Sequence, residues 1–215
     1  MMQEKVEDRG KVRRETLQLI RLERLFDVVF AIIVWRAITL FPTPTDKQFG
    51  WEQILPFLSA NLGDLVLVLI GILVVIVFWL QNNLIFGNLQ ATDNFHTIIS
   101  ILQLFFLLIF IKALRLGVEL EPSNITRALE SLTAAMVGVA ASWGWWYAIK
   151  NRRLLSPEVT DQYALQLRDR ILAEPLTALI TLPFAFVNPT LWEISWWSYP
   201  LVVWLVRRRR RTKMQ

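Results

Sequence analysis

Long apolar runs dominate the chain, and charged or turn-forming residues separate them. A helix that spans a membrane needs about 20 mostly apolar residues. Six runs meet or approach that length, at positions 25–41, 54–80, 95–116, 125–149, 171–187 and 191–206. The last two are short and are separated only by Asn188 and Pro189, which predicts a tight helical hairpin. The pattern therefore predicts an all-α, polytopic membrane protein with six transmembrane helices.

Composition excludes several classes of protein. Only 19% of the 215 residues are charged and 54% are apolar, whereas soluble domains carry roughly 25% charged residues. The absence of cysteine excludes disulfides, thiol nucleophiles and thiolate metal sites. The single histidine, His96, excludes a multi-histidine metal site, and at the start of a predicted span it is expected to be structural rather than a sensor.

Ionisable residues inside a membrane are costly and usually functional. The predicted spans carry few of them: Asp27, Arg36 and Asp64, with Glu174 and Glu193 near the interfaces. None of these forms a pair at the spacing of a catalytic acid and base. We therefore predict that the chain is not an enzyme and holds no cofactor or metal.

Charge asymmetry predicts the topology. The chain divides into a charged, amphipathic N-terminal segment (1–24), a six-helix transmembrane domain (25–206) and a basic tail (207–215). With six spans, eighteen of the 23 lysines and arginines lie on the side of the two termini and four on the other. The positive-inside rule then predicts a multi-pass protein of the cell membrane with both termini in the cytoplasm. Because the basic tail directly follows a span, we expect it to contact anionic lipid and not nucleic acid.

The first predicted span is the most polar. Ile32, Arg36 and Thr39 follow i, i+4, i+7 spacing and so share one helical face. Arg36 would lie roughly 14 Å deep at 1.5 Å rise per residue, so this face must contact protein or water. Two interpretations stay open: an internal ion pair of Arg36 with Asp64 on the second span, or a pore-lining face.

Two segments resemble a known family. The stretch from Arg21 to Asp27, Arg-Leu-Glu-Arg-Leu-Phe-Asp, is similar to the first-helix signature of the transmembrane protein 175 family of potassium channels. That signature reads Arg, three residues, then Phe-Ser-Asp. Further along, Phe78-Trp79-Leu-Gln-Asn-Asn, then Asp93 and the apolar run 104–108, resembles the family's second-to-third helix region.

The resemblance implies a bacterial channel with one six-helix repeat per chain, assembled as a homotetramer. In that family the first helix lines a central pore narrowed by large apolar side chains, and conduction is leak-type and potassium-permeable. By position, Ile32 would form the apolar constriction. Arg21 and Asp27 would belong to a hydrogen-bonded group at the cytoplasmic end of the helix, while Phe26 replaces the serine of the signature.

Three departures from the family lie on the same helix. Trp35 stands where the family usually has threonine, Arg36 where it has a large aliphatic residue, and Thr39 where it has a bulky pore residue. A ring of four arginines in a narrow, poorly screened passage would repel cations. The alternatives to a potassium channel are therefore an anion-permeable or non-conducting member of the same fold, or a secondary transporter.

Overall fold

Helices account for most of the described chain. The computed structural model describes residues 2–44, 50–120 and 123–211. Its α-helices are α1 (Met2–Ile38), α2 (Ile54–Ala60), α3 (Leu62–Phe86), α4 (Asn94–Glu119), α5 (Asn124–Ile149), α6 (Asp161–Thr181), α7 (Pro189–Ser195) and α8 (Tyr199–Arg211). Short 3-10 turns are η1 (Trp51–Gln53), η2 (Lys150–Arg152), η3 (Leu182–Phe186) and η4 (Trp196–Ser198). The described ranges contain no strand, only an isolated bridge between Leu89 and Leu155, so the all-α prediction is confirmed.

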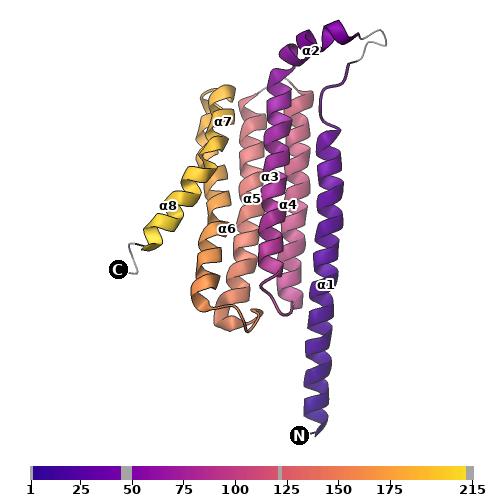
Figure 1. Ribbon diagram of the computed structural model, residues 1–215, viewed down its shortest axis with the longest axis vertical. Helices are drawn as coiled ribbons and strands as arrows, with labels where there is room; N and C mark the ends of the chain where they lie inside the picture. The colour runs from indigo at the N-terminus through magenta and orange to yellow at the C-terminus, as the bar shows by residue number, and fades with distance from the viewer. Residues whose placement is uncertain (1, 45–49, 121–122, 212–215) are drawn as a thin grey trace.

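The long helices α3 to α6 form a bundle, with α1 along one side and α7 and α8 on the other (Figure 1). Within it, α5 packs extensively against both α4 and α6, and α1 packs against α3 and α4. The N-terminal part of α1 extends beyond the bundle at one end, and α2 lies beyond the opposite end (Figure 1). The expected N-terminal segment and first span are thus one continuous helix. The side chains of residues 1–12 lie outside the described part.

The third and fourth predicted spans agree with α4 and α5, which begin at well-formed caps. The Asp93 carboxylate accepts the backbone N–H of His96 at 2.8 Å. The Ser123 hydroxyl likewise accepts the N–H of Thr126 at 3.2 Å. Such caps satisfy N–H groups that the first helical turn leaves without partners. Both boundaries were therefore predictable from local chemistry.

The second predicted span, 54–80, is wrong as one helix. The chain breaks at Asn61, which has the non-helical angles φ −108° and ψ 19° and separates the short α2 from α3. The Asn61 side chain donates to the Phe57 carbonyl at 2.8 Å, and this local bond competes with continuation of the helix. Consequently the long helix begins at Leu62 and ends at Phe86, six residues later than predicted.

The fifth and sixth boundaries also need correction. Helix α6 begins ten residues earlier than predicted, at Asp161, where the Thr160 hydroxyl accepts the N–H of Tyr163 at 3.2 Å. The sixth run is interrupted by η4 and continues as α8. Pro200, which has no N–H to donate, lies at this break. As a result α8 diverges from α6 instead of completing a straight hairpin (Figure 1).

Apolar side chains cover both the interior and the outside of the bundle. Helices α3 and α4 are long and apolar enough to cross a membrane by length and composition. Many large apolar side chains point outward, including Leu69, Ile98 and Phe105, each at least half exposed. An outside of this kind suits lipid rather than water. Of the basic tail, residues 212–215 lie outside the described part, while the Arg208 guanidinium lies 5.1 Å from the Trp204 ring centroid.

Candidate functional site

Helix α1 has two distinct faces within the single chain. Its inner face is buried against α3 and α4 and consists of Leu19, Leu22, Phe26, Phe30, Ile33 and Ala37. The spacing of these positions, three or four residues apart, is that of one helical stripe. Its outer face points away from the bundle and is not covered by any described part of the chain. This outer face is the candidate functional site.

The four residues predicted to line a pore all lie on the outer face. Ile32 is 53% exposed and Trp35 is 66% exposed. Arg36 and Thr39 are exposed as well, and the Thr39 hydroxyl donates to the Arg36 carbonyl at 2.7 Å. One helical face thus carries an apolar, an aromatic, a cationic and a hydroxyl side chain within about two turns.

The alternative partner for Arg36 does not engage it. Among the described residues no ion pair joins Arg36 to Asp64. The Asp64 carboxylate instead lies close enough to Glu193 for the two to interact electrostatically. Asp64 lies in the first turn of α3, whereas Arg36, in the last turn of α1, is exposed on the face of α1 that does not pack on α3. Within the single chain, Arg36 is therefore not paired with Asp64.

The two segments that carry the family resemblance contact each other. The Trp79 indole N–H on α3 donates to the Asp27 carboxylate on α1, with 3.3 Å between Nε1 and Oδ1. One residue earlier, the Phe26 ring meets the Phe86 ring edge-to-face at a centroid distance of 4.8 Å. Asp27 therefore accepts a hydrogen bond from an indole on the neighbouring helix. No ion pair joins Arg21 to Asp27 within the described residues.

A second carboxyl group lies one turn before Asp27. Glu23 is partly buried, and this burial raises its pKa above the usual value; the neighbouring Asp27 carboxylate adds to the increase. Two like charges four residues apart on a helix repel each other.

Further hydrogen bonds hold α1 to the start of α4. The Gln18 amide donates to the Thr97 hydroxyl at 2.9 Å and to the Asn94 side chain at 3.2 Å. The backbone carbonyl of Glu15 accepts the N–H of Thr92 at 3.2 Å. These contacts and the Asp27–Trp79 bond are roughly two and a half to three turns apart along α1. The inner face is therefore fixed in both register and rotation, which also fixes where the outer face points.

His96 has a structural role in this region. It is 1% exposed, and its Nδ1 lies 2.8 Å from the Thr92 hydroxyl. The edge-to-face ring of Phe86 covers it at 6.5 Å. The nearby Asp93 carboxylate also accepts the Tyr147 hydroxyl at 2.6 Å, which links α5 to the same end of the bundle.

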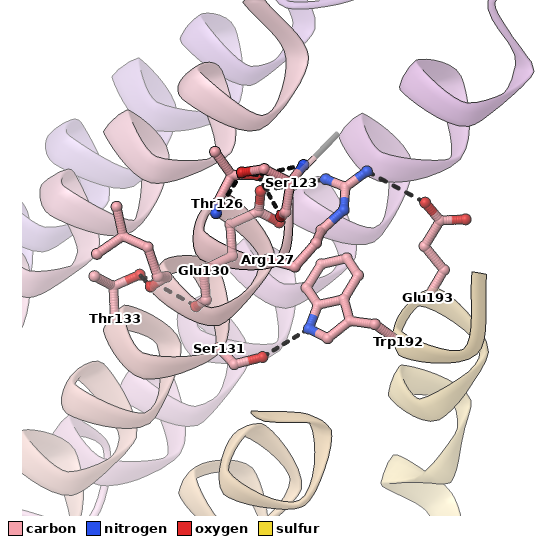
Figure 2. A network of polar contacts seen from close by, with 9 residues as sticks. Ser123, Thr126, Arg127, Glu130, Ser131, Thr133, Trp192 and Glu193 are labelled. Carbon is pink, nitrogen blue, oxygen red and sulfur yellow. Dashed lines mark hydrogen bonds and ion pairs between the residues drawn. The ribbon is translucent and has the colours of Figure 1, made fainter. Parts of the chain in front are cut away.

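A buried charged cluster at the opposite end was not anticipated as a site. Arg127 and Glu130 on α5 are 2% and 1% exposed, with 3.3 Å between Nη1 and Oε1 (Figure 2). The second guanidinium nitrogen of Arg127 lies 3.4 Å from Glu193 on α7. The same guanidinium stacks 5.0 Å from the centroid of the Trp192 ring. The Arg127 guanidinium on α5 therefore contacts two residues of α7.

Hydroxyl groups extend this cluster toward α6. The Trp192 indole donates to the Ser131 hydroxyl at 2.8 Å (Figure 2), and Ser131 lies 2.8 Å from the Thr181 hydroxyl. The i, i+3 spacing of Arg127 and Glu130 is the sequence signal for this pair. The burial of Arg127 depends on α7, a helix whose position the sequence pattern did not predict.

Comparisons with known proteins agree on the fold. No protein-family model matches the chain, and no curated protein matches it in sequence. Among solved structures, it is similar to a homologue of the lysosomal potassium-selective channel TMEM175 from Chamaesiphon minutus, with TM-score 0.71, 15% identity, and coverage of 89% of this chain and 97% of that one. It is also similar to a variant of the potassium channel MtTMEM175, from Marivirga, with TM-score 0.61, 16% identity, and coverage of 89% and 93%. The chain therefore has the fold of these TMEM175 channels.

Proposed function

We propose that this chain is the subunit of a homotetrameric, potassium-permeable channel of leak type, with α1 lining a central pore. The shared fold supports the proposal, because it covers nearly the whole chain. The contact between Asp27 and Trp79 supports it as well, since it joins the two segments that resemble the family. Ions would be the transported species, and no catalytic step is required.

The observation that carries the proposal is the outer face of α1. Arg36 lies in the last turn of α1, and a positive side chain on a membrane-spanning helix is costly against lipid and normally faces protein or water. Arg36 is exposed, and the single chain covers neither it nor Ile32 nor Trp35. Four copies of α1 around a shared axis would provide both the missing protein contacts and a water-filled passage.

Ile32 is the proposed constriction of that passage. It is 53% exposed on the face that would point to the axis, and its side chain is bulky and apolar. A ring of such side chains narrows a pore and promotes its dewetting. Trp35, Arg36 and Thr39 would line the same passage toward its outer mouth.

One observation favours a second candidate, an anion-permeable channel of the same fold. Within the described residues Arg36 has no acidic partner. Rings of arginine or lysine are the selectivity elements of anion pores. The two candidates differ only in the sign of the charge on the conducted ion, so a single electrical measurement distinguishes them.

That measurement is the reversal potential of the purified protein in planar bilayers under a gradient of potassium chloride. Potassium permeation moves the reversal potential toward the potassium equilibrium potential, and chloride permeation moves it the opposite way. Flux that saturates and requires a coupling ion, without unitary currents, would contradict both candidates and indicate a transporter. Protein-free bilayers are the control. Native mass spectrometry tests the assembly, with four chains of 25.1 kDa expected.

We also propose six membrane crossings with both termini in the cytoplasm. The absence of cysteine makes this directly testable, because any introduced thiol is the only one present. Gln53→Cys and Glu158→Cys change exposed positions at opposite ends of the bundle. An impermeant maleimide should label Gln53→Cys in intact cells but Glu158→Cys only after permeabilisation. The reverse pattern would contradict the orientation.

A further inference from the structure

A small cavity lies inside the bundle where α3, α4 and α5 meet. Its volume is about 10 Å³, which is about that of one water-sized sphere and close to the minimum that holds a water molecule. On the α5 side the wall includes the small residues Ala140, Ala141 and Gly144, which leave this space open. Every residue that lines the cavity is buried.

Four of the lining side chains are polar, although the cavity lies in the interior of the bundle. They are Asn82 on α3 and His96, Ser100 and Gln103 on α4. The three residues of α4 follow i, i+4, i+7 spacing and therefore share one face of that helix. A long side chain on a helix leans toward the N-terminus of the helix, so the Gln103 side chain extends toward Ser100 and His96.

The protein does not satisfy the Gln103 amide. The residue is 4% exposed, and its Nε2 atom is buried without a hydrogen-bond partner among the described residues. A buried donor without a partner is costly, and buried polar groups nearly always bond to protein or to an internal water molecule. The Gln103 amide therefore requires a partner that the cavity can hold.

Other polar groups around the cavity have hydrogen-bonding capacity to spare. The Asn82 amide nitrogen donates to the Phe78 carbonyl at 2.8 Å, which leaves Oδ1 of Asn82 as an acceptor. Nδ1 of His96 lies 2.8 Å from the Thr92 hydroxyl. The ring edge that carries Nε2 faces Gly144, where a Cβ atom would lie 3.7 Å from this nitrogen. An amide donor, an amide acceptor and a ring nitrogen thus belong to the walls of one cavity.

We propose that this cavity binds one water molecule, which accepts a hydrogen bond from Gln103 and bridges it to His96 on the same helix and to Asn82 on α3. Buried water molecules typically form about three hydrogen bonds to polar groups that otherwise lack partners. These three side chains supply that number, and water both donates and accepts, as the walls require. The site is separate from the outer face of α1 and does not depend on which ion the protein conducts.

The single histidine makes this site accessible to nuclear magnetic resonance. The full-length protein is labelled with ¹⁵N-histidine and reconstituted in liposomes, and magnetisation is transferred from water protons to the His96 ring under magic-angle spinning. We expect fast transfer to Nε2 although the residue is only 1% exposed, because the bound water lies within hydrogen-bonding distance. Slow transfer, as for a group in purely apolar surroundings, would overturn the proposal.

Two glycine variants locate the water molecule. A Cβ atom at Gly144 would lie in ordinary contact with its neighbours, 3.5 Å from Ile99 and 3.7 Å from His96. Gly144→Ala therefore fills the cavity without a collision, and the fast transfer to His96 should be lost. Gly63→Ala is the control and should keep it, because nothing lies within 4 Å of its Cβ position. Fast transfer in folded Gly144→Ala would overturn the proposal, since the water would then lie elsewhere.

Thermal unfolding provides an independent readout. Gln103→Met keeps an unbranched side chain and removes the amide, and with it the need for water. Gly144→Ala should therefore raise the unfolding temperature by about 2–4 °C more in the Gln103→Met background than in the wild type, the shift expected for about one buried hydrogen bond in a chain of this size. In a dry cavity the added methyl group would act alike in both backgrounds, so equal shifts would overturn the proposal.

Discussion

The indole N–H of Trp79 donates to the Asp27 carboxylate across the α1–α3 contact, with 3.3 Å between the two atoms. This bond joins the helix that carries the candidate pore face to the helix that supports it. Carboxylates accept stronger hydrogen bonds than neutral groups do. The rotation of α1, and with it the direction of Ile32 and Arg36, depends on such contacts.

Trp79→Phe should therefore destabilise the protein by about 0.5–1.5 kcal/mol, because it keeps the aromatic ring and removes the donor of an exposed hydrogen bond. Thermal unfolding in detergent is the measurement. Trp51→Phe is the matched control, since Trp51 is 89% exposed and its loss should leave the unfolding temperature unchanged. Equal effects of the two changes would show that the bond to Asp27 contributes no stability.

The buried pair Arg127–Glu130 leaves no room beside Gly117 on α4. A Cβ atom at Gly117 would collide with a Glu130 carboxyl oxygen and lie 3.1 Å from the Arg127 guanidinium. Gly117→Ala should therefore cost about 1–3 kcal/mol, the usual penalty of overpacking. Gly63→Ala is the control, because nothing lies within 4 Å of its Cβ position. A Gly117→Ala protein as stable as Gly63→Ala would contradict the observed packing.

Local chemistry explains which parts of the fold were predictable. Asp93 and Ser123 are side-chain caps that precede uninterrupted apolar runs, and the two helices after them agree with the sequence prediction. The outer face of α1 was predictable because helical spacing alone places Ile32 and Arg36 together. The break at Asn61 depended on a single side-chain bond to the backbone inside an apolar run, and hydropathy does not detect such a bond.

The parts that could not be predicted depend on contacts between distant segments. Arg127 is buried because Glu193 and Trp192, more than sixty residues later, cover it. Glu174, which the pattern placed near an interface, is buried because Gln81 on α3 meets it. No periodicity within one helix contains this information. The same limit applies to assembly, because the partner of the α1 outer face is outside the single chain.

Replacing Ile32 tests the proposed constriction. Ile32→Asn should raise the potassium chloride conductance of reconstituted channels. A ring of polar side chains of similar size keeps water in the passage, whereas a ring of apolar side chains expels it. Single-channel recording is the measurement. Ile125→Asn makes the same change at an exposed position in the first turn of α5 and should leave conductance unchanged. Unaltered conductance of folded Ile32→Asn tetramers would show that the constriction lies elsewhere.

Because Arg36 and Asp64 do not form an ion pair in the chain, their effects on stability should be independent. Arg36→Leu and Asp64→Leu should add in the double variant to within about 0.5 kcal/mol. Thermal unfolding of the wild type, the two single variants and the double variant gives the double-mutant cycle. A coupling energy well above that value would show that the two side chains meet in the assembled protein, for example between neighbouring subunits.

The sign of the conducted ion depends on Arg36. Four guanidinium groups facing one axis would disfavour potassium and favour chloride, because charge is weakly screened in a narrow low-dielectric passage. Arg36→Leu should therefore shift the reversal potential in a potassium chloride gradient toward the potassium equilibrium potential. Arg36→Lys keeps the charge and should keep the wild-type value. If Arg36→Leu and the wild type reverse at the same potential, the guanidinium groups do not face the conduction path, and the outer face of α1 contacts protein rather than permeant ions.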